Sequence, residues 1–115
     1  MTVKIYHNPR CTKSRQTLQL LKDKGIEPEV IEYLKTPPST AELADILEKL
    51  GMEPRELIRK QEAEYKGSGL DNSALDRQAL ISGMAANPIL IERPIVLANG
   101  KAAIGRPPEN VLGIL

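Results

Sequence analysis

Aromatic side chains are nearly absent from this chain of 115 residues, which contains no Trp, no Phe and only three Tyr. Modules that bind single-stranded nucleic acid stack bases on aromatic platforms, so this composition argues against a partner of that kind. It also predicts a core built from Leu, Ile, Val, Ala and Met. With 41% hydrophobic residues, the chain has the length and composition of one folded domain.

Cysteine and histidine are equally scarce, because Cys11 and His7 are the only residues of their types. A single thiol cannot form an internal disulfide, and a structural zinc site needs about four protein ligands. The sequence therefore predicts neither a disulfide scaffold nor a metal site. A free thiol on a chain without an export signal indicates a cytoplasmic protein.

The sequence also lacks a long apolar run and a large net charge, and each absence excludes a class of binding partner. No apolar run approaches the ~20 residues of a transmembrane helix. The formal net charge is only +1, which excludes a strongly basic DNA-binding domain and a polybasic membrane anchor. We therefore expect no nucleic acid and no membrane as partner. The first 26 residues nevertheless carry six Lys or Arg against one Asp, so this segment favours anions.

The N-terminal third has the pattern of a βαβ unit. Residues 3–7 alternate between apolar and polar and predict a short strand, and residues 29–33 predict a second one. Between them, the pattern turns helical at Thr12, and Gly25 ends the helix. A strand, a helix and a strand in this order predict a parallel pair with a right-handed crossover.

The middle of the chain is predicted to be helical. Ser39 and Glu42 have the spacing of a capping box, which begins a helix that Gly51 ends. Pro54 starts a short helix that carries residues 57–59. The remaining predicted segments are a loop over 67–69 and a helix over 73–86, which Asn87-Pro88 ends.

The last third returns to strands. Residues 95–98 and 101–104 flank Asn99-Gly100, the strongest two-residue signal for a β-hairpin. Pro107-Pro108 then starts a terminal helix. The order of elements predicts an α/β fold, in which helices pack on a mixed sheet.

Cys11 lies between the end of a predicted strand and the start of a helix. Unpaired backbone N–H groups and the helix dipole stabilise a thiolate there, and residues 10–15 add three positive charges. Such surroundings lower a cysteine pKa from about 8.5 to roughly 3.5–7.5. The alternative is a small buried hydrophobic residue. The flanking charges and the loop with Pro9 favour a reactive thiol.

Two neighbours could influence this thiol. Cys11 and Ser14 have the spacing of a CxxC redox motif with Ser in the second position, so any redox cycle needs an external thiol. Ser14 either donates a hydrogen bond to the thiolate or satisfies backbone groups in the first helical turn. His7 either caps the loop or tunes the thiol as a nearby cation or donor.

Three arginines stand where the chain changes direction. Arg59 follows a short apolar turn, Arg93 precedes a buried strand, and Arg106 follows the last strand. Taken alone, each of these arginines is typical of a charged residue on the protein surface. Guanidinium groups bind tetrahedral oxyanions through paired donors, so the alternative is that all three converge beside the thiol on one oxyanion.

Four blocks of this sequence resemble the signature of one family. They are residues 7–15, 57–60, 92–96 and 105–109. In content, order and spacing they are similar to the glutaredoxin-coupled arsenate reductase (ArsC-like) family, in particular a short subgroup. The resemblance spans nearly the whole chain, and the family is related to Spx-type proteins.

The resemblance implies a thioredoxin-like fold in a single domain over residues 1–115, with a helical insertion over about 36–88 between the second and third strands. It assigns the catalytic cysteine to Cys11 and the histidine that tunes it to His7. The oxyanion-binding arginines fall on Arg59, Arg93 and Arg106. It also implies a cis peptide bond before Pro94.

The activity implied by the resemblance is reduction of arsenate to arsenite through a covalent adduct on Cys11. Glutathione is the expected co-substrate, glutaredoxin the expected protein partner, and no bound cofactor is expected. Two alternatives stay open: a glutathione-dependent thiol or disulfide reductase of the same fold, and a non-enzymatic, Spx-like regulator that binds RNA polymerase. An oxyanion pocket argues against the regulator, which has no need of one.

Overall fold

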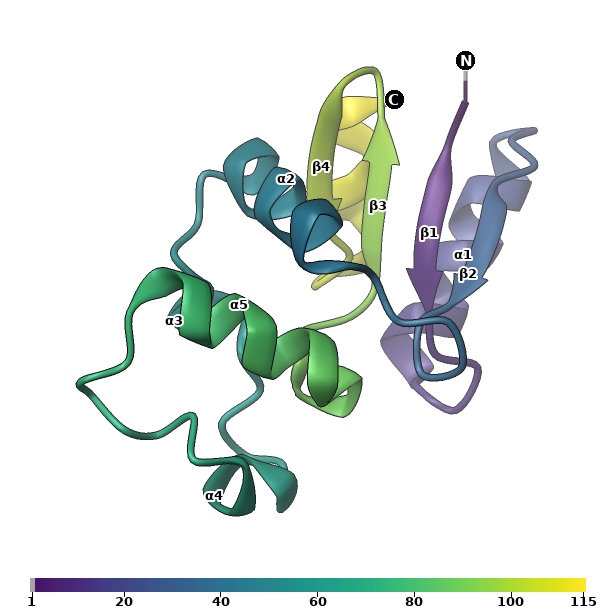
Figure 1. The fold of residues 1–115 in the computed structure, drawn as a ribbon. Coiled ribbons are helices and arrows are strands. Elements are labelled where there is room, and N and C mark those ends of the chain that lie inside the picture. Colours follow the sequence, from purple (N-terminus) through teal and green to yellow (C-terminus); the bar gives the residue numbers. More distant parts are fainter. Residues whose placement is uncertain (1) are drawn as a thin grey trace. The chain divides into compact units, whose positions relative to one another are not determined.

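The chain forms two units in the computed structural model, which describes residues 2–115 (Figure 1). The described part of Met1–Thr36 packs with Arg93–Leu115, and we call this part the sheet unit. Pro37–Glu92 forms the second, which we call the helical unit. The single domain that we expect over residues 1–115 stays a prediction.

The sheet unit contains a four-stranded mixed sheet in the order β2-β1-β3-β4 (Figure 1). β1 (Lys4–His7) and β2 (Glu29–Glu32) are parallel, with α1 (Thr12–Asp23) as the crossover between them. β3 (Ile95–Ala98) runs antiparallel to β1 and to β4 (Lys101–Ile104). The predicted α/β fold with a mixed sheet is confirmed.

Branched aliphatic residues fill the core of this unit, as the aromatic-poor composition predicts. α1 and η2 (Pro108–Ile114) pack on the sheet, and Leu21, Val111, Ile5 and Val96 are completely buried between these layers. The prediction was too narrow in one respect, because two of the three tyrosines are also buried. These two are Tyr6 and Tyr33.

The C-terminal part follows the prediction except in its helix type. Asn99 and Gly100 both have positive φ angles, 55° and 72°, which is the geometry that the predicted two-residue hairpin requires. The terminal helix, however, is a 3₁₀-helix over Pro108–Ile114. Asn110 donates its N–H to the Pro107 carbonyl at 3.0 Å, a bond of three-residue spacing. Two prolines at its start contribute no N–H groups to this helix.

The helical unit lies between β2 and β3 in the chain, as predicted for the insertion. α2 (Thr40–Leu50) has both hydrogen bonds of the predicted capping box, from Glu42 N–H to Ser39 Oγ at 3.1 Å and from Ser39 N–H to Glu42 Oε1 at 2.9 Å. Gly51 ends the helix in the left-handed region, with φ 66°. The remaining helices are α3 (Pro54–Leu57), α4 (Glu64–Ser68), α5 (Arg77–Ala86) and the 3₁₀-helix η1 (Pro88–Leu90).

Three predicted boundaries in this unit are wrong. Ile58 lies outside α3 because it forms an antiparallel bridge with Ile91. Residues 67 and 68, expected in a loop, form the last turn of α4, and Gly69 ends it with φ 77°. α5 begins four residues later than predicted, because Asp76 caps it by accepting the Ala79 N–H at 2.8 Å.

Candidate active site around Cys11

Cys11 is the N-cap residue of α1, as the sequence predicts. Its backbone is extended, with φ −94° and ψ 124°, and its N–H donates to the Asn8 carbonyl at 3.0 Å. The Asn8 side chain closes the same turn by accepting the Arg10 N–H at 3.0 Å. This turn leads directly from the end of β1 into the helix. The thiol is therefore partly exposed at the positive end of α1.

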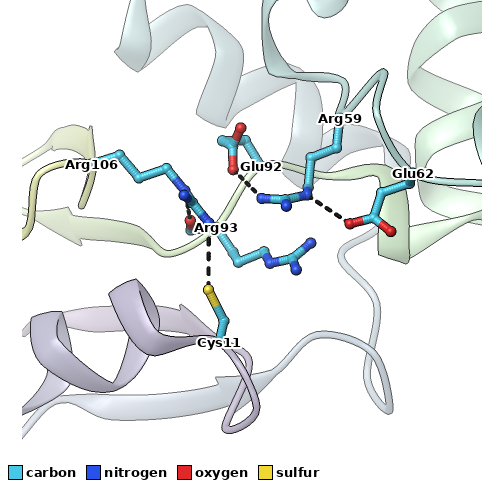
Figure 2. A network of polar contacts seen from close by, with 6 residues as sticks. All are labelled: Cys11, Arg59, Glu62, Glu92, Arg93 and Arg106. Atoms are coloured by element: carbon cyan, nitrogen blue, oxygen red, sulfur yellow. Dashed lines mark hydrogen bonds and ion pairs between the residues drawn. The ribbon is translucent and has the colours of Figure 1, made fainter.

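Arg106 contacts this thiol (Figure 2), and the Arg93 side chain also acts on it. Arg106 donates from Nη2 to the Cys11 Sγ at 3.4 Å, and the Arg93 side chain also hydrogen-bonds to the thiol. Arg106 donates in addition from Nε to the carbonyl oxygen of Arg93 at 2.8 Å. The Arg106 guanidinium is thus held beside the sulfur atom through both Nε and Nη2.

Backbone packing brings these two arginines to α1. Gly105 donates its N–H to the Pro94 carbonyl at 3.0 Å, which joins the segments that carry Arg93 and Arg106. A Cβ atom on Gly105 would collide with Thr17 of α1 and lie 2.8 Å from the Pro94 Cγ, so only glycine allows this approach. The expected cis bond before Pro94 is present, and the bond between Arg106 and Pro107 is also cis.

The pKa of the Cys11 thiol is lowered from its ordinary value. Partial burial raises the pKa, but the backbone N–H of Ser14 and the guanidinium groups of Arg93 and Arg106 lower it by more. The expected contribution from the basic residues within 10–15 is not the cause. Arg15, for example, donates to the Pro9 carbonyl at 3.0 Å instead. The cations that stabilise the thiolate are therefore about 80 to 95 residues away in the sequence.

We expect the lowered pKa to appear directly in alkylation kinetics. The thiolate is the reactive form, so the iodoacetamide rate rises with pH and levels off above the thiol pKa. A lowered pKa moves the midpoint to a lower pH than that of the same single thiol in the urea-unfolded chain. Arg106→Gln should move the midpoint back upward. Equal midpoints for the folded and the unfolded chain would contradict this assignment.

Behind the thiol, His7 and Ser14 form a buried pair. The Ser14 Oγ lies 2.6 Å from the His7 Nδ1 and accepts the Asn8 N–H at 3.0 Å. The serine hydroxyl therefore satisfies the backbone, one of the two predicted alternatives, while the serine N–H faces the thiol. Burial lowers the pKa of His7, which disfavours the charged form of its ring. The role of His7 in tuning Cys11, as a cation or as a donor, stays a prediction.

The third predicted arginine, Arg59, belongs to the helical unit and is paired with two carboxylates (Figure 2). Its Nη1 lies 2.7 Å from Glu92 Oε1, and its Nε lies 3.1 Å from Glu62 Oε1. All three side chains are partly buried. The expected convergence of Arg59 with the other two arginines stays a prediction.

Comparison with known proteins identifies the family. Residues 6–114 match the family model described as ArsC family. The chain belongs to the ArsC family. It is 60% identical over 114 residues to the uncharacterised protein YfgD of Escherichia coli K12, which covers 98% of this chain and 96% of YfgD.

Other members carry a functional name. A Neisseria meningitidis protein named arsenate reductase is 54% identical over 114 residues, covering 98% of this chain and 97% of that one. The solved structure of a protein described as arsenate reductase from Vibrio cholerae superposes with a TM-score of 0.96 at 53% identity, covering 100% of this chain and 98% of that one. The thioredoxin-like fold of the ArsC family is thus confirmed.

Two carboxylates lie beside the predicted arginines and were not among the predicted site residues. Glu62 follows Arg59 at a spacing of three residues, and Glu92 directly precedes Arg93 in one of the resembling blocks. The first spacing is a recognisable signal for an ion pair. The pairing of Glu92 with Arg59 gives no such signal, because the two residues are 33 positions apart in the sequence.

Within residues 2–115, no group of three His, Cys, Asp or Glu side chains is arranged to hold a metal ion. No helix in the same range is long and apolar enough to cross a membrane.

Proposed function

We propose that this ArsC-family chain is an arsenate reductase that depends on glutathione and glutaredoxin, with Cys11 as its nucleophile. The observation that carries the proposal is a single thiol at a helix N-terminus, beside the guanidinium groups of Arg93 and Arg106. This arrangement combines an activated nucleophile with donors for a tetrahedral oxyanion. The names of close relatives support arsenate as that oxyanion.

In the first step, the Cys11 thiolate attacks arsenic(V). A sulfur–arsenic bond forms, an arsenic–oxygen bond breaks, and the departing oxygen takes up protons and leaves as water. Negative charge accumulates on the remaining oxygens in the pentavalent transition state. Arg93 and Arg106 offset this charge because both guanidinium groups already act on the Cys11 sulfur, and Arg59 is proposed as the third donor.

In the second step, glutathione supplies the other thiol. Its sulfur attacks the sulfur of Cys11, the sulfur–arsenic bond breaks, and the bonding electron pair stays on arsenic, which leaves as arsenite. The mixed disulfide between Cys11 and glutathione is then reduced by glutaredoxin. One arsenate and two thiols thus give one arsenite, one disulfide and one water. Glutathione keeps thiols reduced in the cytosol, which agrees with the expected cytoplasmic location.

A coupled assay tests this function. NADPH oxidation is followed with glutathione, glutaredoxin and glutathione reductase, with and without arsenate. We expect saturable oxidation that requires arsenate. Oxidation that requires a low-molecular-weight disulfide instead, with none on arsenate, would overturn the proposal in favour of a thiol or disulfide reductase. The absence of both activities, with capture of RNA polymerase, would favour the Spx-like alternative.

Replacing any one of the three arginines by lysine should impair arsenate reduction. Lysine keeps the charge but cannot supply the paired donors of a guanidinium fork. We expect kcat/KM for arsenate to fall about tenfold or more for Arg59→Lys, Arg93→Lys and Arg106→Lys. Thermal unfolding should change little, since the charge is retained. Wild-type kinetics in all three variants would place the oxyanion site elsewhere.

A further inference from the structure

Thr17 is a completely buried polar residue in the second turn of α1, the helix that Cys11 caps. Its hydroxyl donates to the Lys13 carbonyl at 2.8 Å, one turn earlier in the same helix. A threonine has two branches at Cβ, and a hydroxyl bound to the preceding turn fixes the direction of both. Thr17 therefore presents a surface of defined shape to the residues that pack on it.

Both branches of Thr17 face Gly105. A Cβ atom on this glycine would collide with the Thr17 Oγ1 and lie 3.0 Å from the Thr17 Cγ2. The Oγ1 also lies 3.5 Å from the Gly105 carbonyl oxygen, which is too long for a strong hydrogen bond. The contact is thus chiefly one of shape. In close-packed surroundings, the threonine determines how near the Gly105 backbone comes to α1.

The backbone at Gly105 leads directly into one of the arginines at the thiol. Arg106 is the next residue, and its N–H donates to the Ile104 carbonyl at 2.9 Å across this glycine. Its guanidinium reaches the Cys11 Sγ at 3.4 Å. A displacement of Gly105 therefore moves the guanidinium relative to the sulfur, and small misplacements of such groups are costly in catalysis. All of these residues belong to the sheet unit.

We propose that Thr17 is a positioning residue of the active site, which keeps the Arg106 guanidinium at the Cys11 sulfur by holding Gly105 against α1. Thr17 acts through Arg106 and not on the thiol itself. For arsenate reduction, the inference rests on the proposed function, in which Arg106 binds the oxyanion. Its effect on the thiol is independent of the substrate, so the two can be tested separately.

Iodoacetamide alkylation as a function of pH reports on Arg106 through the thiolate that it stabilises. Thr17→Ala removes both branches, and we expect the midpoint to rise by about half a pH unit, which is an about threefold lower ratio of thiolate to thiol. Thr17→Val keeps two branches at Cβ and should have a midpoint close to that of the wild type. If Thr17→Ala does not fold, Thr17→Ser, which loses only the methyl group, should give a smaller rise.

The matched control is Leu21→Val. Leu21 lies one turn after Thr17 on the same face of α1 and is equally buried, but it packs in the hydrophobic core of the sheet unit. Leu21→Val should lower the melting temperature without moving the alkylation midpoint. A mutant cycle adds a second control. If Thr17 acts through Arg106, Thr17→Ala causes no further rise when Arg106→Gln is already present.

The outcomes separate this inference from the proposed function. An unchanged midpoint in Thr17→Ala, or in Thr17→Ser where the first does not fold, would overturn the inference alone. An equal rise in Thr17→Val or Leu21→Val, or a further rise in the Arg106→Gln background, would do the same. In the coupled assay, kcat/KM for arsenate should fall in Thr17→Ala and recover in Thr17→Val. Midpoints that move as expected in a chain without arsenate reduction would support the inference and overturn only the proposed function.

Discussion

Cys11→Ser is expected to abolish arsenate-dependent turnover, with a loss of at least ~10³-fold in kcat, as is typical when a nucleophile is removed. A serine hydroxyl stays protonated where the Cys11 thiol ionises, because Arg93 and Arg106 cannot lower its far higher pKa enough. No second thiol can take over, since Cys11 is the only cysteine. The coupled NADPH assay measures the loss.

The fold should tolerate this substitution, which makes the loss of activity interpretable. Cys11 is the N-cap of α1 and makes no side-chain cap hydrogen bond, whereas serine is among the preferred N-cap residues. We therefore expect the melting temperature of Cys11→Ser to equal or exceed that of the wild type. Turnover above about one hundredth of the wild-type rate would show that the nucleophile is a different group.

Omission of glutathione is expected to have the second large effect. With thioredoxin and thioredoxin reductase as the only reductants, turnover should fall by at least about a hundredfold, because the second electron-donating thiol is missing. The position of a resolving cysteine is occupied by Ser14, whose hydroxyl is bound to His7 and to the backbone of Asn8. The chain therefore cannot release its own adduct as an internal disulfide.

The control for this experiment is to restore the missing thiol and measure whether the rate recovers. Adding glutathione and glutaredoxin to the same thioredoxin mixture should return the full rate, which excludes damage to the enzyme during removal of glutathione. Formation of one arsenic adduct per chain without release of arsenite agrees with the proposed cycle, because the first step needs only Cys11 and the second needs glutathione. Sustained multiple turnover with thioredoxin alone would refute it.

Several structural features follow from short sequence patterns. The capping box of Ser39 and Glu42 and the Asn99-Gly100 turn appear where predicted, because each depends on hydrogen bonds or φ angles within a few residues. The same holds for Cys11 at the start of α1, where the loop with Pro9 separates a strand from a helix. Where the local pattern was weaker, as before α5, the predicted boundary missed the cap at Asp76.

The electrostatics of the thiol depended on tertiary structure. The sequence placed basic residues 10–15 beside Cys11, but successive residues of a helix point in different directions around its axis, and proximity in sequence did not bring their charges to the sulfur. Arg93 and Arg106 reach it because Gly105 packs against Thr17 and Pro94. Residue types and spacing left their convergence open, and the family resemblance named them without a geometry.

The sequence by itself determined a lone thiol at a helix N-terminus, a hairpin and a parallel βαβ unit, since these rest on residue type and local spacing. Only the tertiary structure decided which polar and charged side chains lie in contact. It turned Ser14 toward His7, and it paired Arg59 with Glu92 through the bridge of Ile58 and Ile91. Such pairings depend on how distant segments pack, because a charge acts over a few ångströms in space, whatever its separation along the chain.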